Sequence, residues 1–185
     1  MAENTSKIHI ASNAIVLLGG SPFSSFTEDS AEARISANLY ESSYLSLLTN
    51  HRWRFATKHA RLARLSEKPI MDYEYMFQLP SDIEYLIKAS VSNYTIHESR
   101  LYANATDINI GYIFRVKEDT LPSYFVKTLE FFLAAQFAVP LTGDMDKGKY
   151  YSALYGDALK KAKFADSTQQ PNISFQHNPY VDVRA

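Results

Sequence analysis

The spacing of apolar residues changes twice along this chain, and that change constrains the fold more than any other feature. Apolar residues follow helical spacing up to about residue 50, alternate with polar residues from 53 to 116, and return to helical spacing after residue 120. Alternation is typical of strands that have one face in the core and the other in water. The sequence therefore predicts an α+β fold, an α-helical bundle of about four helices with an inserted antiparallel β-sheet and an extended C-terminal tail.

The same pattern divides the chain into three parts. Residues 1–50 and 120–165 are assigned to the helical bundle, and residues 51–119 to the inserted antiparallel β region. Residues 166–185 are expected to form the extended tail, because a polar stretch with Pro171 follows the last helical stripe. With 185 residues, the chain is long enough to bury a sizeable core.

Capping residues indicate where the two N-terminal helices begin and end. Thr5 or Ser6 is placed to cap the first helix, and Gly19 follows its last apolar turn as a stop. Asp29 stands three residues before Glu32, which favours a capping-type start for the second helix. That helix has apolar residues on more than one side, so we expect it to contact more than one partner.

Prolines and an aspartate mark the two C-terminal helices. Pro122 lies where a third helix starts, and Pro140 is expected to end it. Between them the run 125–139 is apolar nearly all round, which predicts the buried central helix. Asp144 is expected to cap the fourth helix.

Several strands are expected in the middle third of the chain. The first is expected over Trp53–Thr57, the clearest over 73–79, and others over 83–91 and 108–116. A hairpin is expected from 94 to 102, turning at Glu98-Ser99. Together these segments predict one antiparallel sheet with a wet face.

Composition and motifs favour a structural role over catalysis. The chain has no cysteine, which excludes disulfides and thiolate chemistry, and its net charge of −1 gives no global field toward nucleic acid or membrane. Its five histidines show no metal-ligand spacing, and no phosphate-binding or nucleophile motif is present. We therefore expect no catalytic residue, cofactor, metal or membrane partner.

Two features keep other functions open. Glu130 is a carboxylate inside the apolar third helix, where it could pair with a base, face a subunit interface or serve a cell-wall hydrolase. The densest basic patch could contact DNA or an acidic protein surface, as in a nucleic-acid-binding module. This patch comprises Arg52, Arg54, Lys58, Arg61 and Arg64.

An ordered series of short landmarks resembles a known family. Glu28-Asp29-Ser30 and Glu32-Ala33 open a helix that closes into Trp-Arg-Phe-Ala at 53–56, followed by Ala-Arg-Leu-Ala at 60–63. Leu-Pro-Ser-Asp at 79–82, Leu-Pro at 121–122, Leu-Ala-Ala at 133–135 and Pro-Leu-Thr-Gly at 140–143 complete the series. Over about residues 5–165 the chain resembles tail tubular protein A and related head-to-tail adaptors of short-tailed (T7-like) bacteriophages.

The resemblance implies a structural virion protein at the head-tail junction, assembled in the host cytoplasm. Such proteins form a ring of twelve copies that joins the portal protein to a tail nozzle of the tail tubular protein B type, with tail fibres as further possible partners. DNA passes through the ring lumen during genome ejection without sequence-specific binding.

Two sets of residues are assigned to the contacts of such a ring. Apolar and tyrosine side chains favour a subunit interface; the set comprises Ile35, Leu39, Tyr40, Tyr44, Tyr73 and Tyr75. Apolar residues on a tail with no core of its own suggest docking elsewhere, and the resemblance implies the portal as the target. This portal-docking set comprises Ile173, Phe175, Tyr180 and Val183.

Overall fold

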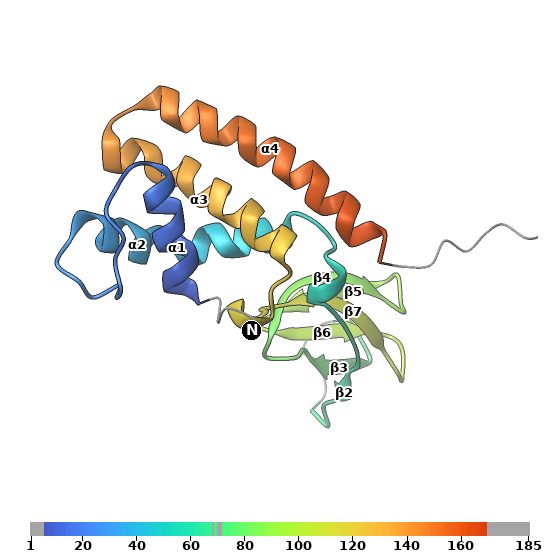
Figure 1. Cartoon of the computed structure of the whole chain (residues 1–185). Helices are drawn as coiled ribbons and strands as arrows, with labels where there is room; N and C mark the ends of the chain where they lie inside the picture. Colours follow the sequence, from blue (N-terminus) through green and yellow to red (C-terminus); the bar gives the residue numbers. More distant parts are fainter. Residues whose placement is uncertain (1–5, 68, 70–71, 170–185) are drawn as a thin grey trace, which may run out of the picture.

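The computed structural model describes residues 6–67, 69 and 72–169 and has the α+β fold that the sequence predicts. In the described part, helices occupy one end of the molecule and strands the other (Figure 1). The helices are α1 (Lys7–Leu17), α2 (Ala31–Thr49), α3 (Ser123–Thr142) and α4 (Met145–Ser167). The strands between α2 and α3 are β1 (Thr57–Arg61), β2 (Ala63–Arg64), β3 (Tyr75–Gln78), β4 (Ile83–Ala89), β5 (Tyr94–His97), β6 (Arg100–Ala103) and β7 (Asn109–Phe114).

The ends of α1 and α4 confirm the capping predictions. The Ser6 side chain accepts a hydrogen bond from the backbone N–H of His9, and Asp144 accepts from the N–H groups of Asp146 and Lys147. Gly19 follows α1 at a φ of 84°, a left-handed conformation that glycine adopts without a steric penalty.

Three predicted helix boundaries are wrong. Ser30, not Asp29, caps α2, because its hydroxyl accepts from the N–H of Ala33. Pro140 lies inside α3, which continues to Thr142 and ends at Gly143 with a φ of 68°. The fourth helix also reaches Ser167, two residues beyond the predicted limit of the bundle, because Asp166 is buried within it.

α3 is the central helix of the bundle. It lies between α4 on one side and α1 and α2 on the other (Figure 1). Its buried face includes Phe125, Leu129, Leu133 and Phe137. By length and composition it could also cross a membrane, but here it packs against the other three helices, as the core helix of a bundle does.

The strands form two antiparallel sheets instead of the single sheet that alternation suggests. One sheet has the order β1-β7-β4 and the other β2-β3-β6-β5. β1 and β2 are separated by Leu62 alone, so the chain passes from one sheet to the other almost without interruption. A second apolar cluster, distinct from the core of the bundle, includes Leu62, Phe77, Leu101 and Ile110, from both sheets.

The predicted first strand starts too early. Trp53 is fully buried in the core of the bundle, and Arg54–Ala56 forms a short 3₁₀ turn before β1 begins at Thr57. The hairpin is confirmed at Glu98 and Ser99, whose φ values of 48° and 61° connect β5 to β6.

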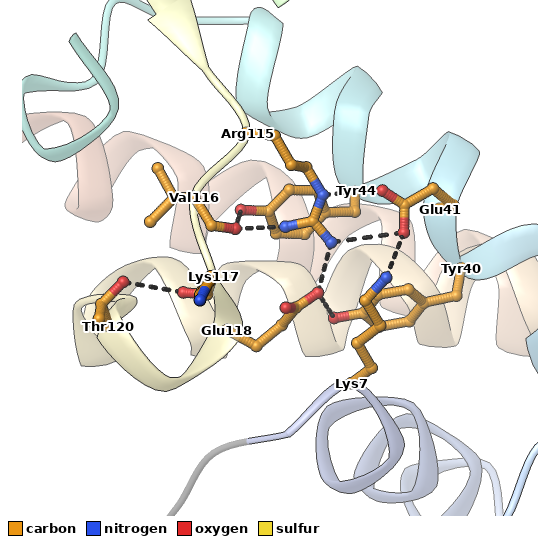
Figure 2. A network of polar contacts seen from close by, with 9 residues as sticks. All are labelled: Lys7, Tyr40, Glu41, Tyr44, Arg115, Val116, Lys117, Glu118 and Thr120. Carbon is orange, nitrogen blue, oxygen red and sulfur yellow. Dashed lines mark hydrogen bonds and ion pairs between the residues drawn. The ribbon is translucent and has the colours of Figure 1, made fainter. Parts of the chain in front are cut away.

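A partly buried polar network joins the β region to the bundle (Figure 2). Arg115 donates to Glu41 at 2.8 Å and to Glu118 at 2.6 Å, and its guanidinium lies 3.8 Å from the centre of the Tyr44 ring. Tyr40 donates to Glu118 at 3.3 Å. Although burial lowers the pKa of Arg115, the hydrogen bonds to Glu41 and Glu118 raise it above its usual value, so the cation is firmly held.

Candidate functional site

The structure does not bring the predicted basic patch together. Arg52 and Arg54 precede β1 and are exposed, and the Arg54 backbone N–H donates to Asp166. On β1, Lys58 and Arg61 fall on opposite faces of the strand because the side-chain period is two. Arg64 is on β2, in the other sheet.

Three of these side chains already have partners in the same chain. The Lys58 ammonium lies 2.8 Å from Asp82, and Arg61 pairs with Asp107. The Arg64 guanidinium lies 4.9 Å from the centre of the Tyr75 ring. The patch is therefore weaker as an electrostatic surface than the sequence suggests.

A different basic site forms on the solvent face of the β1-β7-β4 sheet. The register places His59 of β1 and Lys88 of β4 on either side of Gly111 in β7, and Arg61 beside Asn109. A hollow of about 480 Å³ opens here. We call it the basic hollow; it is lined by His59, Ala60, Arg61, Lys88, Ala89, Ser90, Asn109 and Ile110.

Gly111 allows the two walls of the hollow to approach. A Cβ at this position would lie 3.1 Å from two atoms of the His59 ring and 3.3 Å from Lys88 Cγ. Both side chains therefore lean over the bare backbone of β7. Ser90 Oγ accepts from the Asn109 N–H at 3.1 Å, which leaves the serine hydroxyl hydrogen available to a ligand.

The lining of the basic hollow suits an anion. It contains three basic side chains and no carboxylate, and one of the three, Arg61, is paired with Asp107. Within the described residues, neither His59 nor Lys88 forms an ion pair. These donors could bind phosphate or carboxylate oxygens by charge-assisted hydrogen bonds.

Two residues of the predicted subunit interface belong to the core of the bundle. Tyr40 and Tyr44 are 3% and 0% exposed, and their hydroxyls donate to Glu118 and to the Val116 carbonyl. Burial is the main cause that raises the pKa of both phenols. The prediction for these two is wrong, because the second apolar face of α2 is covered by the same chain.

The other four interface residues keep part of their surface. Ile35 and Leu39 are partly buried at the edge of the main core. Tyr73 is partly buried and hydrogen-bonds to Thr95 at 2.7 Å, and Tyr75 lies under Arg64. The four predicted portal-docking residues, Ile173, Phe175, Tyr180 and Val183, lie outside the described residues.

Glu130 is engaged by neighbouring side chains of its own chain. Glu130 is 7% exposed and accepts hydrogen bonds from Asn13 at 2.8 Å and Lys127 at 3.0 Å, so it is held as a structural ion pair. No group of three or more His, Asp or Glu side chains that could hold a metal ion occurs among these residues.

Large apolar side chains are exposed around the turn between α3 and α4. They are Val16 at 50%, Val139 at 48%, Met145 at 66% and Tyr150 at 61%. Hydrogen bonds from Lys147 and Tyr151 to carbonyls at the end of α1 hold that end against the start of α4. We call Val16, Val139, Met145 and Tyr150 the apolar tip.

Three residues that line the basic hollow were not predicted from the sequence. Lys88, Ser90 and Asn109 are ordinary surface residues in the linear pattern, and only strand register groups them around Gly111. The glycine within a strand pattern was the one available signal, because it often marks a close approach. Asp166 was likewise not recognised as a buried acceptor.

No protein-family model matches the chain, and a search of curated proteins finds no match either. The resemblance to phage adaptors therefore depends on the order of the sequence landmarks described above.

Proposed function

We propose that this chain is a structural virion protein, a ring-forming adaptor between the portal and the tail nozzle of a short-tailed phage. The ordered landmarks from Glu28 to Gly143 support the family, and the residues of the apolar tip support assembly. The single observation on which assembly depends is that four large apolar side chains at one end of the bundle stay in water in the isolated subunit.

A ring explains this exposure. Large apolar side chains that stay exposed at one end of a bundle are candidates for a contact site, because leaving apolar surface in water is unfavourable. In a closed ring each copy presents one surface to the next and a different surface to the previous copy. The apolar tip would serve as one of these surfaces, with Ile35, Leu39, Tyr73 and Tyr75 as candidates for the other.

Mass photometry of the purified protein, alone and mixed with portal rings from the same phage, tests the proposal. We expect a mass increment of twelve subunits on each portal ring. Tyr150→Glu and Met145→Glu should reduce the increment, whereas the matched control Ser152→Glu, also exposed on α4, should not. An absence of association at micromolar concentration would count against the adaptor role.

A nucleic-acid-binding module is the second candidate, and the basic hollow favours it. Two basic side chains without an ion pair among the described residues, Lys88 and His59, face solvent beside backbone that has no side chain in the way. Phosphate contacts of this kind would position DNA without reading its sequence. The same contacts are compatible with DNA passing through an adaptor ring.

Fluorescence anisotropy with a short duplex DNA separates this candidate from the first. Lys88→Gln should weaken binding and make the slope of log K against log salt shallower by about one, as expected for the loss of one phosphate contact. The control is Lys160→Gln, since Lys160 already pairs with Asp157 at 3.4 Å. Equal binding by both variants would remove the basic hollow as a DNA contact.

A further inference from the structure

An open groove runs between α3 and α4, on the surface of the bundle. Its volume is about 450 Å³, within the range of about 300–1,000 Å³ typical of ligand pockets. The lining residues are Tyr124, Lys127, Thr128, Phe131, Leu154, Asp157, Ala158, Lys161, Ala162 and Ala165. We call this feature the α3–α4 groove.

The floor of the α3–α4 groove is apolar because α4 places small residues along it. Ala158, Ala162 and Ala165 leave space where larger side chains would have filled the gap against α3. Charged residues stand at the rim, where Lys127 pairs with Glu130 and Asp157 pairs with Lys160. An apolar strip with a polar rim is the usual form of a peptide-binding groove.

The chain leaves α4 beside one end of this groove. The Gln169 side chain donates to the Tyr124 hydroxyl at 3.4 Å, and Tyr124 itself donates to Asp166 at 2.9 Å. Burial and Asp166 raise the pKa of Tyr124 to about 12, so the phenol stays protonated and available for these contacts. The last described residue thus contacts a residue that lines the groove.

The sequence that follows has the composition needed to fill such a groove. Residues 170–185 include the apolar side chains of Ile173, Phe175, Tyr180 and Val183 between polar ones. The groove extends along α4 from Ala165 to Leu154, about 16 Å at the helical rise of 1.5 Å per residue. Five extended residues cover about the same distance, so the segment is long enough to return along it.

We propose that residues 173–183 dock into the α3–α4 groove of their own chain, with Phe175 and Tyr180 as the main anchors. The short connection from Gln169 favours the same chain over another copy, because it gives an effective concentration in the millimolar range. This inference does not depend on the proposed function. A partner that captures the same segment would first have to displace it, which would reduce its apparent affinity.

Disulfide trapping tests the docking directly, because the chain has no cysteine of its own. The double variant Ala158→Cys with Ser174→Cys places one thiol in the groove and one beside Phe175. The matched control, Ala153→Cys with Ser174→Cys, moves the first thiol to an exposed site on α4 outside the groove. Mild oxidation of dilute protein is followed on non-reducing gels and by intact mass.

The docked state predicts an intramolecular disulfide that forms at least about tenfold faster with Ala158→Cys than with the control, because the two Cα atoms must approach within about 7 Å. Adding Phe175→Ser and Tyr180→Ser should reduce the rate to that of the control. Equal rates in the two double variants would overturn the proposal. Disulfide-linked dimers as the main product with Ala158→Cys would also overturn it, in favour of exchange between copies.

Discussion

The network around Arg115 leads to a quantitative prediction about what joins the two parts of the molecule. Arg115 follows β7, and its guanidinium reaches Glu41 on α2 and Glu118 before α3 (Figure 2). The side chains of Arg115 and Glu118 are 21% and 10% exposed, so little water is available to replace a lost partner. Arg115→Met keeps the aliphatic bulk of the side chain but removes its charge and hydrogen bonds.

We expect Arg115→Met to lower the free energy of unfolding by about 3–4 kcal/mol. Breaking a buried ion pair by removing one partner costs about 3–5 kcal/mol, and the lower part of that range applies because Arg115 keeps some exposure. Loss of the contact with the Tyr44 ring is included in this estimate. For a chain of this length the unfolding midpoint should fall by about 6–16 °C.

Urea unfolding followed by tryptophan fluorescence measures this change. Trp53 is the only tryptophan and is fully buried, so its emission reports unfolding of the bundle core. Arg34→Met is the matched control, because its partner Asp29 lies 3.6 Å away and both side chains are largely exposed. The control should leave the midpoint unchanged.

A second substitution separates buried charge from lost packing. If an uncompensated Glu118 is what destabilises Arg115→Met, then adding Glu118→Gln should restore about 1–2 kcal/mol. The reasoning is refuted if Arg115→Met unfolds like Arg34→Met. It is refuted as well if the two substitutions at the network simply add.

Three further predictions follow from individual polar side chains. Ser36 is fully buried on α2, and its hydroxyl has no hydrogen-bond partner in the described part of the chain. Ser36→Ala should therefore raise the free energy of unfolding, measured in urea, by up to about 1 kcal/mol. A loss of stability would contradict this prediction. Asp166 is 1% exposed and accepts hydrogen bonds from the Tyr124 hydroxyl and from the Arg54 N–H. Asp166→Ala should therefore lower the free energy of unfolding in the same assay by about 2–3 kcal/mol. A change below roughly 0.5 kcal/mol, the level of a surface substitution, would show that these bonds are dispensable. Hydrogen bonding to Arg115 holds the pKa of Glu41 below its usual value near 4.5. The stabilisation that Glu41 contributes is therefore present above that pH and is lost as the pH falls through the lower folded-state pKa. Between pH 5 and 3, the urea midpoint should drop less in Glu41→Gln than in the unmodified chain.

Local sequence signals determined the order and type of the elements. Caps such as Ser6 and Asp144 act within one turn of helix, and the Glu98-Ser99 turn acts between adjacent strands, so neither needs the rest of the chain to be recognised. The change from helical to alternating spacing likewise depends only on neighbouring residues. These local features are sufficient to predict the α+β fold without any tertiary contact.

Only the tertiary structure decided which apolar faces are free and which charges meet. Tyr40 and Tyr44 have the pattern of an interface, yet a segment more than seventy positions later in the chain covers them. Lys88 and His59 meet across Gly111 because β4 and β1 both pair with β7, a choice that alternation cannot make. Long-range pairing is set by the packing of whole elements, and a local pattern is compatible with several such packings.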